Sequence, residues 1–279
     1  MCAGAHTRRL DTLARVASKS RLDSLLADRG LFDSRSRAAA AIMAGEVRLG
    51  PGGLPARKPG QLVADDVAVA VERGREYVSR GGVKLANALD ALGLDPAGRR
   101  CLDVGASTGG FTDCLLQRGA LHVVALDVAY GELAWSLRED PRVTVIERSN
   151  ARELDGSALP YRPGLVTADV SFISLLKVLP AVLRAAAEDF DCLALVKPQF
   201  ELDRGRVGKG GVVRSADDRR EALIRVGEGV VELGYSVCGF ASSGLPGPAG
   251  NRESFVWIRP AGDARAVGDV SAAAAEVEP

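Results

Sequence analysis

The sequence predicts an α/β protein, with a mostly parallel seven-stranded sheet preceded by a small N-terminal α+β module. From Gly82 onward, short apolar strands alternate with helical segments, which is the pattern of repeated βαβ units. A glycine-rich turn joins the first of these strands to a helix. The charge balance differs along the chain, because residues 1–60 hold 11 Lys/Arg and 5 Asp/Glu whereas the others hold 25 and 31. A basic module on an acidic body indicates a polyanionic partner.

The N-terminal module is expected to contain two short helices and a small sheet. Leu22, Leu25 and Leu26 have i, i+3, i+4 spacing, which favours a helix from Arg21 that stops at Gly30. The remaining elements are a helix capped by Ser34 and ended by Gly45, and strands at Val47–Leu49 and Val67–Val71. We assign residues 1–20 to a flexible extension, 21–72 to the module and 73–81 to a linker.

The larger domain is assigned to residues 82–260. Strands are expected at Cys101–Val104, Val123–Asp127, Val143–Ile146, Leu165–Ala168, Leu193–Val196, Ser236–Phe240 and Ser254–Ile258. Helices are expected at Val83–Leu92, Phe111–Arg118, Glu132–Arg138, Leu175–Ala187 and Asp217–Leu233. Residues 203–215 are basic and rich in glycine, which predicts a mobile loop, and the Ala-rich tail, 261–279, is expected to be disordered.

Composition excludes several classes of protein. No apolar run reaches the roughly 18–20 residues that a membrane-spanning helix needs, so no membrane span is expected. The five cysteines are scattered and contain no Cys-x-x-Cys pair. This usage argues for reduced thiols in a cytoplasmic protein and against a disulfide framework or a zinc site.

The glycine-rich turn indicates a cofactor that contains a nucleoside. Residues 102–111 have the sequence LDVGASTGGF, which is a strand end, a glycine turn and a helix start. Glycines let the backbone approach a ligand closely, and the amides of a helix start point toward it. Asp127 ends the next strand, 22 residues beyond Gly105. An acid at that place can hydrogen-bond a ribose diol.

Other sites built on such a turn fit less well. A dinucleotide fingerprint would need glycine at the position of Ser107, and a phosphate-binding P-loop would need a lysine in the turn. Residues 105–109 match the G-x-S-x-G elbow of hydrolases, but that triad needs a later histidine. His6 and His122 are the only histidines, and neither can serve as its base. One further alternative remains at this point, which is a glycine turn that only packs a helix against a strand and binds no ligand.

Four ionisable residues are candidates for one site. Asp169 and Lys197 each directly follow a strand, so both belong at the carboxyl edge, where parallel sheets bind ligands. A lysine that closes an apolar strand is unusual as a purely structural residue, because lysines are rarely buried unpaired. Lys84 on the preceding helix and Glu253 before the last strand are, taken singly, typical of a solvated surface.

Several segments together resemble the TlyA family of bacterial rRNA cytidine 2′-O-methyltransferases, which have the FtsJ-like fold. They are SRGGVKL at 79–85, the glycine turn, ADVSFIS at 168–174, LVKPQFE at 195–201 and GPAGNRE at 247–253. The N-terminal module, with RLD at 21–23, SR at 34–35 and GEV at 45–47, resembles the ribosomal-S-four-like RNA-binding domain. The resemblance therefore implies a class I S-adenosylmethionine methyltransferase domain behind a small RNA-binding domain.

The same resemblance implies a set of functional residues and no metal. Lys84, Asp169, Lys197 and Glu253 would form a catalytic tetrad, in which Lys197 steers and deprotonates the ribose hydroxyl. The residues expected to contact S-adenosylmethionine are Asp103, Gly105, Ala106, Ser107, Gly109, Gly110, Phe111, Asp127, Asn150 and Asp169. The residues expected to contact RNA are Arg21, Arg29, Arg35, Arg37, Arg48 and Lys58.

The implied function is methylation of cytidine ribose in 16S rRNA, 23S rRNA or both, which would make the ribosome sensitive to capreomycin and viomycin. The implied partner is rRNA or a ribosomal subunit. One alternative is a membrane-active haemolysin, a name given to several family members, but the lack of a long apolar segment argues against helical insertion. Another is a catalytically silent RNA-binding module, which the complete tetrad disfavours.

Overall fold

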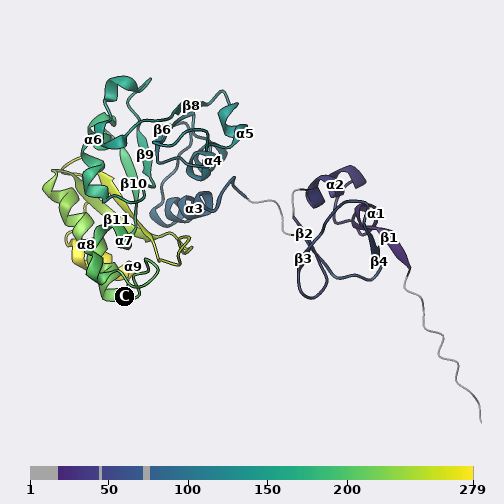
Figure 1. Ribbon diagram of the computed structural model, residues 1–279. Coiled ribbons are helices and arrows are strands. Elements are labelled where there is room, and N and C mark those ends of the chain that lie inside the picture. The colour runs from purple at the N-terminus through teal and green to yellow at the C-terminus, as the bar shows by residue number, and fades with distance from the viewer. Residues whose placement is uncertain (1–17, 44–45, 72–75, 279) are drawn as a thin grey trace, which may run out of the picture. The chain divides into compact units, whose positions relative to one another are not determined.

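The computed structural model describes residues 18–43, 46–71 and 76–278, in two compact units that divide between Arg75 and Glu76 (Figure 1). Much of the expected linker belongs to the second unit. Tyr77 is buried in its core, and a Cβ at Gly82 would lie 2.2 Å from Cγ of the Tyr77 ring. The prediction that residues 73–81 form a linker is therefore wrong from Glu76 onward, while residues 72–75 lie outside the described part.

Over residues 18–43 and 46–71, the first unit contains the two predicted helices and five short strands. Its elements are β1 (Lys19–Arg21), α1 (Leu22–Asp28), α2 (Arg35–Met43), β2 (Val47–Leu49), β3 (Leu54–Pro55), β4 (Leu62–Ala64) and β5 (Val69–Val71). Leu22 and Leu26 of α1 pack against Ala38 and Ile42 of α2 in a small core of their own. Strands β3, β2 and β5 form one sheet, and β1 pairs with β4 in another.

Strand β1 corrects the expected N-terminal boundary. Lys19 pairs with Ala64 and Ser20 with Val63 in an antiparallel ladder. These two residues thus belong to the folded unit, because their backbone hydrogen bonds are satisfied by β4. Residues 1–17, the rest of the expected extension, and the helix stop expected at Gly45 lie outside the described residues.

The second unit has the predicted seven-stranded sheet. Its helices and strands are α3 (Arg80–Leu92), β6 (Arg100–Val104), α4 (Gly110–Gln117), β7 (His122–Leu126), α5 (Trp135–Arg138), β8 (Val143–Ile146), β9 (Leu165–Ala168), α6 (Leu179–Ala185), β10 (Asp191–Val196), α7 (Pro198–Glu201), α8 (Ala216–Glu232), β11 (Ser236–Ser242), β12 (Ser254–Arg259) and α9 (Val270–Val277). Short 3₁₀ turns lie at η1 (Ala151–Glu153), η2 (Gly156–Ala158), η3 (Leu175–Lys177) and η4 (Arg204–Arg206). The strand order is β11-β12-β10-β9-β6-β7-β8, and β12 runs antiparallel to both neighbours. The fold class expected for this domain is confirmed.

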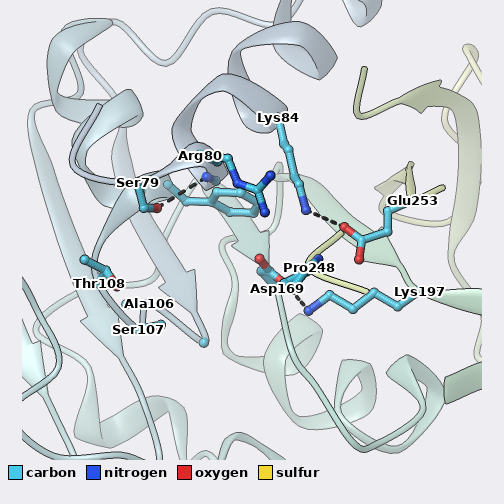
Figure 2. A pocket seen from close by; sticks show the side chains of 14 residues that line it. Ser79, Arg80, Lys84, Ala106, Ser107, Thr108, Asp169, Lys197, Pro248 and Glu253 are labelled. Atoms are coloured by element: carbon cyan, nitrogen blue, oxygen red, sulfur yellow. Dashed lines mark hydrogen bonds and ion pairs between the residues drawn. The ribbon is translucent and has the colours of Figure 1, made fainter. Parts of the chain in front are cut away.

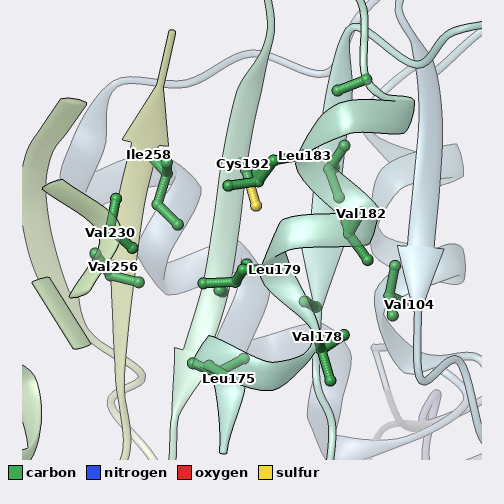
Figure 3. Close-up of a cluster of buried hydrophobic side chains, with 14 of the residues drawn as sticks. Val104, Leu175, Val178, Leu179, Val182, Leu183, Cys192, Val230, Val256 and Ile258 are labelled. Atoms are coloured by element: carbon green, nitrogen blue, oxygen red, sulfur yellow. The ribbon is translucent and has the colours of Figure 1, made fainter. Parts of the chain in front are cut away.

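Helices cover both faces of the sheet (Figure 1). On one face, α6 and α8 enclose a core in which Leu179, Val182 and Val230 meet Cys192 and Val256 of the strands (Figure 3). On the other face, α3, α4 and α5 form a second core. The helix expected at Leu175–Ala187 is divided into η3 and α6, because Pro180 lies in the first turn of α6, where its missing amide costs no hydrogen bond.

The C-terminal tail is folded, which corrects the expected disorder. Helix α9 contacts α8 and β11, and Ala274 is completely buried in the core. Beyond the helix, the buried Glu278 carboxylate accepts a 3.0 Å hydrogen bond from the Arg219 guanidinium of α8. The small side chains of the alanines in α9 allow this close helix packing.

A buried charge cluster at the start of β10 leads to a stability prediction. Asp191 accepts hydrogen bonds from Arg99, Arg259 and the Trp257 indole, at 2.7–2.8 Å. Burial acts to raise the pKa of Asp191, but these hydrogen bonds outweigh it and lower the pKa below 3.8. Asp191→Ala removes the carboxylate that Arg99, Arg259 and the Trp257 indole share, although Arg259 keeps Asp189 and Asp263 as partners. We therefore expect the free energy of unfolding at pH 7 to fall by about 1–3 kcal/mol.

The pH dependence of this loss follows from the lowered pKa. A carboxyl with a lowered folded-state pKa stabilises the fold above its unfolded pKa of about 3.9, and this stabilisation disappears as the pH falls through the folded value. The difference between wild type and Asp191→Ala in chemical denaturation should therefore shrink below about pH 4. Asp189→Ala is the control, since Asp189 also pairs with Arg259 but its side chain is 86% exposed. Equal losses in both variants would contradict the prediction.

Candidate active site

The site lies where the strand order reverses direction. From β6 the chain continues outward through β7 and β8, whereas β9 returns to the opposite side of β6 and leads to β10. Ligands of open α/β sheets bind at such a switch point, beyond the carboxyl ends of the strands. Gly105 follows β6 and Asp169 follows β9, and the Asp169 amide donates a 2.8 Å hydrogen bond to the Val104 carbonyl.

The four tetrad residues line one cavity of about 240 Å³ (Figure 2). Lys84 Nζ lies 2.5 Å from Glu253 Oε2, and Lys197 Nζ lies 2.5 Å from Asp169 Oδ1. The first pair is buried, whereas Asp169 and Lys197 stay partly accessible. The structure thus brings together residues from α3, from the ends of β9 and β10 and from the start of β12. Their places after strands predicted the proximity of Asp169 and Lys197, whereas only the resemblance implied Lys84 and Glu253.

Lys197 is held on two sides. Besides the Asp169 carboxylate, its ammonium group donates a 2.8 Å hydrogen bond to Ser171 Oγ. An ammonium group has three donors, so this arrangement leaves one for a ligand in the cavity. Ser171 was missed by the sequence analysis, although it is two residues from Asp169 in a segment singled out there.

A second cavity, of about 550 Å³, adjoins the first through Gly105, Ser107 and Asp169, which line both. Asp127 and Asn150 line its polar side. The Asp127 carboxylate accepts 2.7 Å hydrogen bonds from the Ser107 and Ala129 amides. Each of its oxygens keeps a second lone pair, so a diol can still donate to it.

Asp103 does not line either cavity, in contrast to its expected contact with the cofactor. It is completely buried, and its carboxylate accepts hydrogen bonds from Thr112 Oγ1 at 2.7 Å and Thr167 Oγ1 at 3.2 Å. Burial raises the pKa of Asp103 to about 7, and these two hydroxyls act against the rise. The side chain therefore ties β6 to α4 and β9 beneath the glycine turn.

The glycines of the turn are required by packing within the chain. Gly105 has a φ of 82°, and a Cβ there would lie 2.3 Å from the Asp169 carbonyl oxygen. Gly109 has a φ of 97°, and a Cβ there would lie 2.3 Å from Leu137 Cδ1 and 2.8 Å from Leu133 Cδ1. Gly109 does not line either cavity, whereas Ala106, Gly110 and Phe111 line the smaller one. The expectation that Gly109 faces the cofactor is corrected accordingly.

Gly109→Val should abolish cofactor binding because it displaces the turn from Leu133 and Leu137. The change also forces a β-branched residue into left-handed backbone, which is strongly disfavoured. We therefore expect a lower melting temperature together with lost binding of S-adenosylmethionine, measured by thermal unfolding and calorimetry. An unchanged melting temperature with lost binding would instead place the added side chain in the ligand cavity.

Two further features of the smaller cavity were missed. Arg80, exposed on α3, lines it one turn before Lys84 (Figure 2). Pro248 lines it from the turn that precedes Glu253. The i, i+4 spacing of Arg80 and Lys84 places both on one helix face and could have identified Arg80 from the sequence.

The loop at 203–215 is attached to that same turn. Asn251, which is 1% exposed, accepts a 2.8 Å hydrogen bond from the Val213 amide and donates one of 2.8 Å to the Gly211 carbonyl. Val213 is itself buried. The buried Asn251 side chain thus holds residues Gly211 and Val213 of the loop in place. This differs from the prediction that the loop at 203–215 is mobile.

The predicted RNA-contacting residues have different surroundings in the first unit. Arg21 and Arg35 both bind the buried Asp23 carboxylate. Arg29 donates hydrogen bonds to the carbonyls of Asp65 and Val67. Arg48 is half-buried on β2, and Arg37 and Lys58 are exposed. Arg21, Arg29 and Arg35 therefore also stabilise the fold of the unit.

Within the described part of the chain, no helix is long and apolar enough to cross a membrane. The described residues also contain no group of three or more His, Cys, Asp or Glu side chains placed to hold a metal ion.

Comparisons with known proteins agree with this geometry. Residues 77–259 match the model of the FtsJ-like methyltransferase family. The 16S/23S rRNA (cytidine-2′-O)-methyltransferase TlyA of Mycobacterium tuberculosis is 53% identical over 88% of this chain and 91% of its own length. Hemolysin A of Brachyspira hyodysenteriae is 37% identical over 84% of this chain and 97% of its own.

A solved structure from Streptococcus thermophilus, which carries a hemolysin name, superposes with a TM-score of 0.69 at 36% identity. The alignment covers 94% of this chain and 96% of that one. The chain therefore belongs to the FtsJ-like methyltransferase family and, within it, to the TlyA group of rRNA (cytidine-2′-O)-methyltransferases.

Proposed function

We propose that this enzyme transfers the methyl group of S-adenosylmethionine to the ribose 2′-hydroxyl of a cytidine in rRNA. The observation that carries the proposal is the Lys197–Asp169 pair, held 2.5 Å apart beside a second cavity large enough for a nucleoside. An amine at the end of the sheet can orient a hydroxyl, and a methyl donor bound in the neighbouring cavity would lie next to it.

The residues of the larger cavity fit the nucleoside part of S-adenosylmethionine. The Asp127 carboxylate has the acceptors that two ribose hydroxyls need, and the Asn150 amide lies on the same wall. The methionine part would lie over Gly105 and Ser107, toward the smaller cavity. When bound, S-adenosylmethionine supplies a sulfonium methyl that is already strongly electrophilic.

The protein then has two tasks, which are to position the hydroxyl and to accept its proton. For the second task Lys197, fixed by Asp169 and Ser171, must be the neutral amine, whose lone pair would accept the proton of the 2′-hydroxyl to give an ammonium group. Bound S-adenosylmethionine would supply the methyl group to the 2′-oxygen and leave as the neutral thioether. The buried Lys84–Glu253 pair, which lines the same cavity, contributes a fixed charge distribution.

Binding and product analysis test this proposal. Calorimetry should show saturable binding of S-adenosylmethionine and none of NAD. Mass mapping of rRNA from a deletion strain should show one or more cytidine ribose methyl groups missing from 16S or 23S rRNA, and the strain should resist capreomycin and viomycin. Complete ribose methylation in the deletion strain would overturn the proposal. Lysis of cells by purified protein that lacks Lys197 would favour a membrane-active function.

A further inference from the structure

The segment between Asp169 and Leu175 contributes to both cavities, yet its backbone is strained. Phe172, in its middle, has a φ of 64°, a left-handed conformation that aromatic residues rarely adopt. Its side chain is 91% exposed, so burial of the ring does not hold the backbone in this shape. Strained segments keep their conformation only when surrounding contacts over-determine it. Something outside the segment must therefore fix it.

Helix α7, which directly follows Lys197, contacts this segment at several positions. Lys197 binds Ser171, and the ring of Phe200 lies 5.3 Å from that of Phe172. Beyond them, Glu201 Oε2 accepts a 2.6 Å hydrogen bond from the Ser174 hydroxyl. Lys197 and the single turn of α7 thus contact the segment at Ser171, Phe172 and Ser174.

Glu201 makes two hydrogen bonds to the segment, one with each carboxylate oxygen. It is 5% exposed, and its second carboxylate oxygen accepts a 2.9 Å hydrogen bond from the buried Leu175 amide. Ser174 in turn accepts a hydrogen bond from the Leu176 amide, so the start of η3 is completely capped. Burying a carboxylate is unfavourable unless its oxygens are hydrogen-bonded. Here the donors for both oxygens come from the segment that carries Asp169 and Ser171.

We propose that Glu201 is a positioning residue for methyl transfer, which fixes the segment from Asp169 to Leu175 against the end of β10. Glu201 does not line either cavity. It acts through the segment, which holds Lys197 and forms part of the wall of the larger cavity. This inference rests on the proposed function for its effect on the reaction rate. Its structural part, the fixing of the segment, can be measured without rRNA.

The test compares Glu201→Ala with two related variants in the full-length enzyme. Glu201→Ala removes both hydrogen bonds, so hydrogen exchange at the Leu175 amide should accelerate and the dissociation constant of S-adenosylmethionine should rise several-fold. At saturating S-adenosylmethionine and rRNA, the methylation rate per folded molecule should fall by about 10–100-fold, as expected for a misplacement near 1 Å. Glu201→Gln keeps an acceptor for Leu175 and Ser174→Ala removes one bond, so both should have intermediate rates.

Arg225→Met is the matched control. Arg225 donates a 2.7 Å hydrogen bond to the Glu201 carbonyl, and its loss leaves both carboxylate contacts in place. This variant should keep the wild-type rate and cofactor affinity per folded molecule, even if its melting temperature falls. The proposal is overturned if Glu201→Ala lowers only the melting temperature, or if Arg225→Met loses as much activity as Glu201→Ala. Should Glu201→Ala fail to fold, the Glu201→Gln and Ser174→Ala results decide by the same criteria.

Failure of the proposed function gives a different pattern. If the wild-type enzyme did not methylate rRNA, cofactor affinity and Leu175 exchange would still change in Glu201→Ala and stay unchanged in Arg225→Met. A wild-type enzyme that methylates rRNA, with unaltered exchange and affinity in Glu201→Ala, would reject the positioning role alone.

Discussion

Lys197→Ala is expected to lower the methylation rate at saturating S-adenosylmethionine and rRNA by about 10²–10⁴-fold, the usual contribution of a general base. The fold should tolerate the change, since its partner Asp169 keeps 25% of its side chain exposed and can be hydrated. Melting temperature, cofactor affinity and rRNA affinity should therefore stay near those of the wild type. Single-turnover transfer of a radiolabelled methyl group measures the effect directly.

Lys197→Arg separates the two roles of the lysine. A guanidinium keeps the positive charge but cannot accept a proton near neutral pH, so this variant should be nearly as inactive as Lys197→Ala. Lys177→Ala is the control, because Lys177 is an exposed lysine on η3 that lines neither cavity. An active arginine variant would show that Lys197 contributes only its charge.

Removal of residues 1–75 should give a folded domain that binds S-adenosylmethionine but has lost most of its rRNA methylation. The cut falls before Glu76 because Tyr77 is part of the core of the second unit. Residues 1–60 have a net charge of +6, and the release of counterions from rRNA phosphates supplies affinity. We expect rRNA affinity near physiological salt to fall by about 100-fold or more. A truncated domain that methylated rRNA as fast as the full chain would contradict the docking role.

Within the N-terminal unit, Arg37→Gln is a cleaner test than Arg35→Gln. Hydrogen bonds from Arg21 and Arg35 hold the pKa of Asp23 well below its usual range, so a change at Arg35 also weakens the fold. Arg37 is exposed on α2. Its loss should flatten the dependence of rRNA affinity on salt concentration by about one ion, with cofactor affinity unchanged.

The sequence determined the order of the elements, because hydrophobic periodicity and glycine turns act within a few residues of each other. It also located the tetrad. Asp169 and Lys197 follow strands, and parallel strands bring their carboxyl ends to one edge, so their proximity follows from topology alone. The resemblance to the TlyA family supplied Lys84 and Glu253, which taken singly look like surface residues.

Only the tertiary structure decided what each side chain contacts. Asp103 and Gly109 look like cofactor ligands in the sequence, but packing places the first beneath the turn and requires the second to make room for Leu137. The tail beyond residue 260 looks disordered, yet α9 folds because its contacts with α8 and β11 bury Ala274. Glu201 ends the segment 195–201 that carries the family resemblance, but its contacts have no local signal, since its partners Ser174 and Leu175 lie more than 25 residues away along the chain. Contacts of this kind join residues that are far apart in the sequence and are buried together only in the folded chain, so local sequence patterns do not predict them.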